Sequence, residues 1–215
     1  MGPAQQFQGT ARMTVHVPDH KTIEAQSLAQ LFTEARTHNA FRDKPVSDEL
    51  LHKALDLAKM GPTSANQSPL RVLFLRSAQA KERLRPALAP GNLDKTMSAP
   101  VVAITAYDER FYEHLPFLMP HRDMKSYFSG NPADVLARIA FQNGTLQVAY
   151  LILALRAVGL DTGPMTGFDN AKVDAEFFPE GHVKSNVLIN IGYGDHEKLF
   201  QRSPRFSFDQ IAKII

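Results

Sequence analysis

Hydrophobic side chains recur at helical spacing in several parts of this chain, and continuous apolar runs lie between them. Residues 26–36 and 50–58 each show one apolar face, which predicts two amphipathic helices. The second helix should begin after Ser47, a favourable N-cap, and stop at Gly61 and Pro62. Buried strands are predicted for the apolar runs 71–76, 100–107 and 186–194.

Weaker patterns complete the element order. A charged surface helix is expected over 78–88, a short helical turn over 92–97, and a short helix around 173–178. Residues 161–168 predict a loop with glycines on both sides of Pro164. Because helices and strands follow one another without regular βαβ alternation, the pattern favours an α+β fold over a doubly wound sheet.

The strongest helical pattern runs from 134 to 158. Its second half, 148–155, is apolar nearly all round, and such a helix must be buried on every side. We expect it to pack against a second subunit, because a monomer of this size rarely encloses a helix completely. A central helix within a single core is the alternative.

The stretch 108–130 is irregular, with several aromatic and proline residues and the charged group His121-Arg122-Asp123. Long connections inside a compact domain are functional lids or contain helices that the pattern does not reveal. We expect this segment to be partly helical and mobile.

Composition narrows the class of protein. The 215 residues are 44% hydrophobic and 21% charged, which fits one globular domain over 26–215 behind a flexible extension at 1–25. A formal net charge of +2 gives no reason to expect nucleic-acid binding, and no apolar run is long enough to span a membrane. With no cysteine and no signal-peptide pattern, the simplest expectation is a cytoplasmic protein.

The familiar catalytic motifs do not occur. The sequence has no HExxH zinc motif, no GxSxG elbow, no phosphate-binding P-loop and no GxGxxG after a strand. What remains is a set of polar loops at the ends of regular elements. Residues 61–69 form one, which is either an ordinary turn or a ligand-binding loop. Possible anion contacts are Arg36, His38, Lys95, Arg202 and Arg205.

The order of these loops resembles the flavin-dependent nitroreductase family. The resemblance is carried by residues 36–41, the loop 62–69, the pair Asn92 and Lys95, residues 164–167 and a basic pair near the carboxyl end. Within that family, the amino-acid sequence of residues 35–39, 61–66 and 159–165 is similar to that of the malonic semialdehyde reductases of pyrimidine degradation.

This resemblance implies an intertwined α+β homodimer with a central mixed, mostly antiparallel sheet and FMN at the subunit interface. It places Arg36 and His38 at the phosphate and ribityl chain, Asn92 and Lys95 near the pyrimidine edge of the flavin, and Ser64 and Asn66 across the interface. Thr166 stands where many relatives carry an acidic residue. The full set of implied cofactor contacts is Arg36, His38, Asn39, Pro62, Thr63, Ser64, Asn66, Asn92, Lys95, Pro164, Met165, Thr166, Gly167, Arg202 and Arg205.

The implied activity is hydride transfer from NADPH or NADH, through FMN, to a small aldehyde acid, with malonic semialdehyde (3-oxopropanoate) the first choice and 3-hydroxypropanoate its product. Arg71 and Arg122 are candidate contacts for the substrate carboxylate, while the chemistry itself belongs to the flavin. Two alternatives remain: a broad-specificity nitroaromatic or quinone reductase, and a flavin-binding module without turnover.

Overall fold

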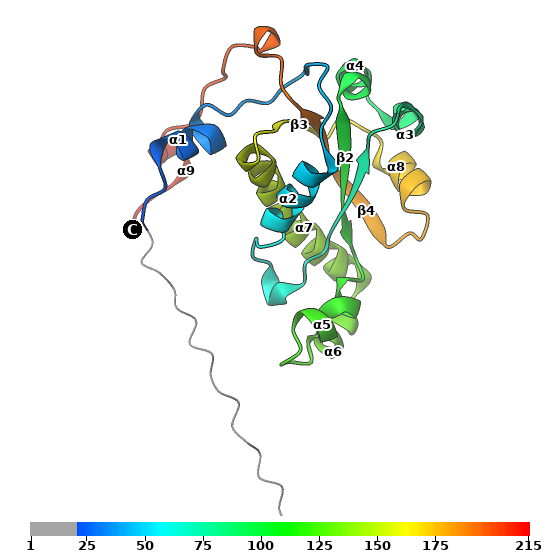
Figure 1. Ribbon diagram of the computed structural model, residues 1–215. Coiled ribbons are helices and arrows are strands. Elements are labelled where there is room, and N and C mark those ends of the chain that lie inside the picture. Colours follow the sequence, from blue (N-terminus) through cyan, green and yellow to red (C-terminus); the bar gives the residue numbers. More distant parts are fainter. Residues whose placement is uncertain (1–20) are drawn as a thin grey trace, which may run out of the picture.

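The computed structural model describes residues 21–215, which form a four-stranded sheet with helices on both faces (Figure 1). The strands are β1 (Leu70–Leu75), β2 (Val101–Asp108), β3 (Asp161–Met165) and β4 (Val183–Gly192), in the order β1-β2-β4-β3. Every pairing between these strands is antiparallel, and an isolated parallel bridge joins Thr37 to Thr162 on β3. The expected α+β fold with a mostly antiparallel sheet is confirmed.

The two central strands are buried on both faces because alternate side chains enter different cores. Val101 and Ala103 of β2 pack with Ile189 and Ile191 of β4 in one core. Their neighbours in sequence, including Val102, Ile104 and Leu188, enter the other core. This explains why the sequence of β2 is continuously apolar rather than alternating.

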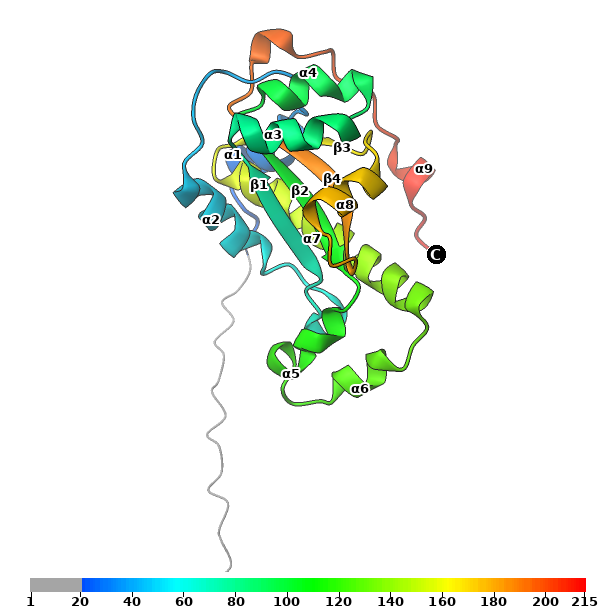
Figure 2. The ribbon, with the colours of Figure 1, turned by 90° about the vertical axis from the view of Figure 1, so that its right-hand side faces the viewer.

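Helices cover each face as separate layers. On one face α2 (Asp48–Ala58) packs against α7 (Ala133–Ala157), and both contribute to the core with Val101. On the other face lie α3 (Ala78–Leu84), the 3₁₀ turn η3 (Arg85–Ala87), α4 (Pro90–Ser98) and α8 (Asn170–Phe177), as Figure 2 shows in front of the sheet.

Shorter elements gather at the two ends of the sheet. At one end lie the 3₁₀ turn η2 (Ser64–Asn66), η4 (Phe111–His114), α5 (Leu115–Leu118) and α6 (Met124–Ser129), and a third apolar cluster joins η4, α5 and α6 to the start of α7. Near the opposite end lie residues 34–46 and the turn η5 (His196–Lys198).

The two chain ends contribute short helical elements. α1 (Ala25–Leu28) continues into a π-helical turn, η1 (Ala29–Thr33), and α9 (Phe208–Ile211) lies near the carboxyl end. α9 stands apart from the helical layers in both views (Figures 1 and 2). Every residue from Gln201 to Ile215 is exposed.

Several local predictions are confirmed. α2 begins after Ser47, whose side-chain oxygen accepts a hydrogen bond from Leu50 N, and ends before Gly61. The segment 108–130 is partly helical, since it holds η4, α5 and α6. The first helix is shorter than predicted, because η1 already ends at Thr33.

The predicted loop 161–168 is wrong in its first half, because residues Asp161–Met165 form strand β3. Pro164 has no backbone N–H, but β4 is the one strand of the described sheet that pairs with β3, so β3 lies at the sheet edge, where proline is tolerated. Gly163 is required for a different reason. A Cβ there would lie 2.4 Å from the carbonyl oxygen of His38.

The expected flexible extension at 1–25 falls, up to residue 20, outside the described residues. Among residues 21–215, none of the helices has the combined length and apolar character needed to cross a bilayer.

The contact between α7 and the sheet should contribute strongly to the stability of the fold. Leu155→Ala removes a fully buried side chain from the core under α2 and α7, so we expect the free energy of unfolding to fall by about 2–5 kcal/mol. Denaturant unfolding measures this change. Leu57→Ala on the exposed face of α2 is the matched control, and an equal loss in the control would contradict the assignment of the core.

Candidate functional site

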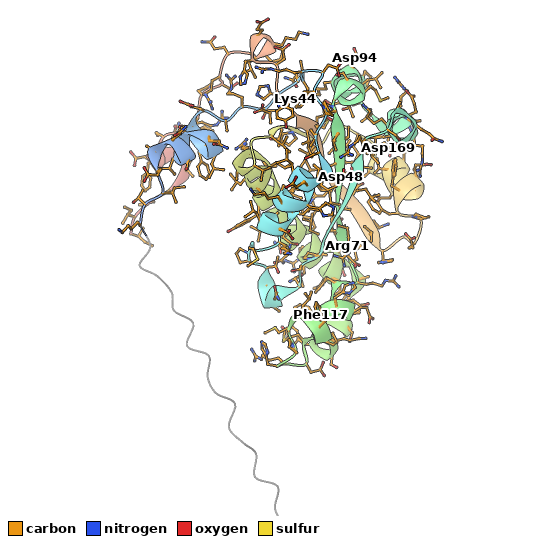
Figure 3. All side chains as sticks on the ribbon, viewed as in Figure 1. Lys44, Asp48, Arg71, Asp94, Phe117 and Asp169 are labelled. Carbon is orange, nitrogen blue, oxygen red and sulfur yellow. The ribbon has the colours of Figure 1, made fainter. Side chains whose placement is uncertain are left out.

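Residues 36–41 bring several predicted site residues against the sheet edge. His38 N donates a hydrogen bond to Thr162 O of β3 at 3.0 Å, next to the parallel bridge of Thr37. The segment therefore runs beside β3, at the end of the molecule that carries Lys44 and Asp94 in Figure 3. Arg36, His38 and Asn39 are held there by backbone pairing.

His38 is a buried histidine with an unusual environment. Its side chain is 1% exposed, its Nε2 lies 3.4 Å from Asp161 Oδ1, and its Nδ1 has no hydrogen-bond partner among the described residues. Burial lowers the pKa of His38, an effect opposed by Asp161 and reinforced by His196 and Arg36. The ring leaves no space at Gly194, where a Cβ would lie 2.1 Å from Nδ1.

Helix α4 supplies Asn92 and Lys95 beside the segment that follows β3. Asn92 Nδ2 donates to Gly167 O at 2.7 Å, and a Cβ at Gly167 would lie 2.4 Å from that nitrogen, so the close approach depends on glycine. Lys95 Nζ lies 3.4 Å from Asn39 Oδ1, a long contact that leaves donors for a ligand. Thr166 is exposed next to this pair, whereas Met165 is buried.

A cavity of about 610 Å³, which we call the basic cavity, opens near η1 and the carboxyl segment. Its four guanidinium groups are those of Arg36, Arg156, Arg202 and Arg205, with no carboxylate among the lining residues of the described chain. Arg36 donates to Phe200 O, and Arg202 Nη2 donates to Ala35 O at 3.1 Å, so the two segments that bear the arginines hold each other. His38 does not line this cavity in the part of the chain described.

The loop 61–69 lies at the opposite end of the sheet. Asn66 Nδ2 donates to Leu118 O at 2.9 Å, which places the loop beside α5, near Phe117 in Figure 3. Asn143 Oδ1 of α7 accepts from Ser64 N at 2.8 Å, and Thr63 Oγ1 accepts from Ser68 N at 3.2 Å. The predicted loop is thus well anchored, with Pro62 and Asn66 exposed.

The predicted site residues therefore form two groups that one chain does not bring together. The first holds Arg36, His38, Asn39, Asn92, Lys95, residues 164–167, Arg202 and Arg205; the second holds residues 62–66. Arg71 and Arg122 lie nearer the second group. Arg71 pairs with Asp108 at 2.6 Å, and Arg122 lines a cavity of about 350 Å³ beside His121 and Lys125.

Sequence reasoning missed several residues that shape these groups. Asp161 stands in the predicted loop, but its distance from His38 in sequence hides their pairing. Arg156 lies at the end of an apolar helix, and the sequence pattern gave it no role apart from that helix. In the structure it lines the basic cavity, and its burial lowers its pKa. Only its charge at the end of an apolar run could have indicated it.

Within residues 21–215, no group of three or more His, Asp or Glu side chains is arranged to hold a metal ion.

Comparison with known proteins gives the class of this protein. The model of the nitroreductase family matches residues 33–193. A Burkholderia lata protein named "Putative NADH dehydrogenase/NAD(P)H nitroreductase" is 59% identical over 193 residues, covering 90% of this chain and 98% of that protein. The chain belongs to the nitroreductase family.

Solved structures support the same fold. A "putative nitroreductase" from Bacillus subtilis superposes with a TM-score of 0.80 at 19% identity, covering 89% of this chain and 100% of that one. A "putative nitroreductase in complex with FMN" from Exiguobacterium sibiricum gives a TM-score of 0.79 at 22% identity, covering 91% of this chain and 100% of that one.

The buried His38 predicts a specific pH dependence of stability. Because its pKa in the folded state lies below the unfolded value of about 6.5, the stability that it contributes is complete above that pH and is lost as pH falls. Replacing it by glutamine, which cannot take up the proton, should flatten the fall in the free energy of unfolding between pH 7.5 and 5.5. Denaturant titrations at both pH values measure this, and equal falls in wild type and His38→Gln would contradict it.

Proposed function

We propose that this protein is an FMN-dependent NAD(P)H oxidoreductase that works as a homodimer, with each FMN between the first group of one subunit and the loop 61–69 of the other. The observation that carries the proposal is that the two groups of polar residues lie at opposite ends of the sheet within one subunit. Such halves can meet at a ligand only when two subunits are combined. The name of the Burkholderia lata relative, which includes NAD(P)H, supports the hydride donor.

The basic cavity fits the phosphate end of FMN. Its four guanidinium groups provide charge-assisted, bidentate donors, and no carboxylate among its described lining residues competes for them. Arg36, Arg202 and Arg205 would bind the phosphate, while the buried His38 would orient the segment that carries Arg36 and Asn39.

The groups on α4 fit the ring end. Asn92 holds the backbone of Gly167, so residues 164–167 would lie against the flavin in a fixed position. Lys95 would donate toward the pyrimidine edge and stabilise negative charge there. Bound FMN would supply the hydride chemistry, accepting a hydride from the nicotinamide and delivering it to the second substrate.

Exposed apolar side chains support a second subunit. On α7, Phe141, Leu146 and Tyr150 are 46%, 53% and 41% exposed. The carboxyl segment exposes Phe200, Phe206, Phe208, Ile211, Ile214 and Ile215. Such a set fits a subunit interface, as the apolar character of α7 predicts, and an exchanged carboxyl arm would bury the exposed side chains of that segment.

The loop contact gives the first test of this proposal. Asn66→Ala should weaken FMN binding roughly tenfold, since it removes an exposed polar side chain that would contact the partner's cofactor, and should leave the dimer intact. The absorbance spectrum of the purified protein and FMN titration followed by fluorescence measure binding, and size-exclusion chromatography measures assembly.

Asn131→Ala is the matched control, because that asparagine also donates to a backbone carbonyl, Tyr127 O, outside the loop. Unchanged FMN affinity in Asn66→Ala would remove the loop from the site. A colourless wild type that does not bind added FMN would defeat the proposal as a whole.

For the natural reaction we propose reduction of 3-oxopropanoate by NAD(P)H and a proton, giving 3-hydroxypropanoate and NAD(P)⁺. One support is the similarity of residues 35–39, 61–66 and 159–165 to the sequences of malonic semialdehyde reductases. The other is Arg122, whose side chain has no hydrogen-bond or ion-pair partner among the described residues. Asp123 lines the same cavity as Arg122, and Lys125 pairs with Glu113, so Arg122 is the residue there that would offer positive charge to a carboxylate near the loop.

A second candidate is reduction of nitroaromatics or quinones in the same pocket. The name of the 59% identical relative favours it, because that name specifies a nitroreductase. A flavin-binding module without turnover is the third candidate and has no comparable support.

Steady-state kinetics separates these candidates. We expect kcat/KM for 3-oxopropanoate to exceed that for a nitroaromatic and for a quinone by at least about tenfold, and Arg122→Ala to reduce the aldehyde value alone by about 1 kcal/mol or more of transition-state stabilisation. Negligible turnover of the aldehyde alongside rapid nitro or quinone reduction would select the second candidate. Absence of hydride transfer from either nicotinamide would select the third.

A further inference from the structure

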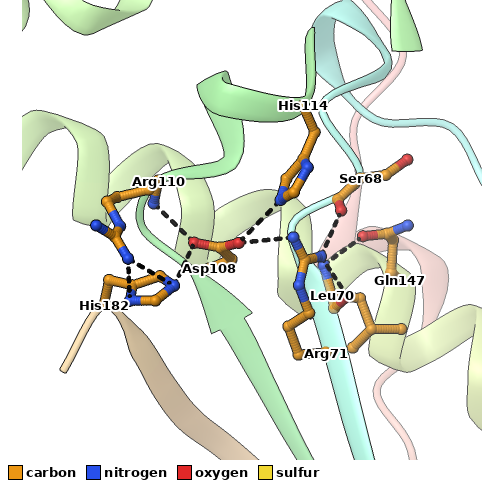
Figure 4. Close-up of polar contacts among 8 residues, drawn as sticks. All are labelled: Ser68, Leu70, Arg71, Asp108, Arg110, His114, Gln147 and His182. Atoms are coloured by element: carbon orange, nitrogen blue, oxygen red, sulfur yellow. Dashed lines mark hydrogen bonds and ion pairs between the residues drawn. The ribbon is translucent and has the colours of Figure 1, made fainter. Parts of the chain in front are cut away.

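A buried carboxylate at the end of β2 connects the loop 61–69 to the segment that follows β2. Asp108 is 3% exposed, and its Oδ2 accepts a hydrogen bond from Arg71 Nη2 at 2.6 Å. His114 Nε2 of η4 lies 3.5 Å from the same oxygen, and Arg110 N donates to Oδ1 at 2.9 Å. Figure 4 shows Asp108 between Arg71 on one side and Arg110 and His182 on the other.

The other end of the Arg71 guanidinium holds the loop. Its Nη1 donates to Ser68 O at 3.2 Å and to Leu70 O at 2.9 Å. One planar group therefore bridges the backbone of the loop and a carboxylate fixed in the sheet. A guanidinium suits this bridge because its donors point in fixed directions.

The loop needs such support because its backbone is strained. Ala65, Asn66 and Ser68 have φ values of 50°, 50° and 40°, in the left-handed region that residues other than glycine rarely adopt. Conformations of this kind persist where surrounding contacts over-determine them, and they gather at functional sites. Arg71 acts on Ser68, the last of the three, while Asn66 is tied to α5 through Leu118 O.

These contacts leave Arg71 little capacity for a substrate. Three of its hydrogen bonds go to protein oxygens, and its side chain is only 33% exposed. The earlier expectation that Arg71 meets the substrate carboxylate therefore gives way to a different role.

We propose that Arg71, held by Asp108, is a positioning residue that fixes the strained conformation in which the loop 61–69 meets the FMN of the partner subunit. The same carboxylate also faces His114, so it holds the loop and the segment η4–α6 in one arrangement. This inference rests on the proposed function, since it needs the loop to contact a cofactor.

Arg71→Met tests the inference through FMN affinity rather than stability. We expect the Kd for FMN to rise roughly tenfold, because misplacing a binding group by a fraction of its length loses most of its contact. The control is Arg83→Met, which removes an exposed ion pair of the same 2.6 Å length to Glu176, between α3 and α8. Dimer formation and thermal stability are measured for both variants.

A double-mutant cycle with Asn66→Ala distinguishes positioning from general structure. If Arg71 acts through the loop, replacing it should change the Kd far less in a protein that already carries Asn66→Ala. The fold-change in Kd of the double variant should then be at least about threefold smaller than the product of the fold-changes of the two single variants. A purely structural role predicts that the two effects multiply. Arg71→Lys, which keeps a charge beside Asp108 but lacks the planar fork, carries the same measurements should Arg71→Met be insoluble.

The outcomes separate the two proposals. FMN binding by the wild type with no difference between Arg71→Met and Arg83→Met would overturn the positioning role alone, as would fully multiplicative effects in the cycle. Loss of FMN binding in every form of the protein, wild type included, would overturn both.

Discussion

The pairing of β2 with β4 is the constraint on which the rest of the molecule depends. Its register runs from Val101 opposite Ile191 to Asp108 opposite Val183, and both strands are buried on two faces. A shift by one residue would exchange the side chains of the two cores, so the register is strongly fixed. The irregularity between Thr105 and Ala106 is stabilised by Thr105 Oγ1, which donates to Val187 O at 2.7 Å.

This central pair also sets the distance between the two polar groups. Near one end, Asn190 of β4 donates to Lys95 O at 3.1 Å and so holds α4, with Asn92 and Lys95, against the sheet. At the other end, Asp108 of β2 holds Arg71 and, through it, the loop 61–69. Because the strands are rigid and buried, the two groups stay at opposite ends of one subunit. In the proposed dimer, the same rigidity would fix the geometry of a cofactor that touches both subunits.

Local sequence signals were enough for much of the fold. Ser47 marks the start of α2 through N-capping, and α2 ends at Ala58, shortly before the predicted stop at Gly61. The apolar run in β2 indicates a strand covered on both faces. The pattern failed at β3, because a strand that contains Gly163 and Pro164 looks like a turn until its edge position and its contact with His38 are known. The pairing of His38 with Asp161 is equally hidden, since neither residue carries a local signal for the other.

The candidate site was less accessible to sequence than the fold. Periodicity located the polar loops, whereas the individual cofactor residues came from the family resemblance and remain predictions. Neither source indicated that Arg71 would be engaged by Asp108, because a lone arginine at the start of a strand looks the same whether it is free or bound. Arg156 was hidden in the same way within the apolar α7.

The edge strand β3 has a consequence for how this protein behaves in concentrated solution. An open strand edge is a template on which other chains can add and begin to aggregate. Here Pro164 removes one backbone donor and residues 37–38 cover part of the edge through the bridge to Thr162. The β3 side of the sheet is thereby closed to the growth of a continuous intermolecular sheet.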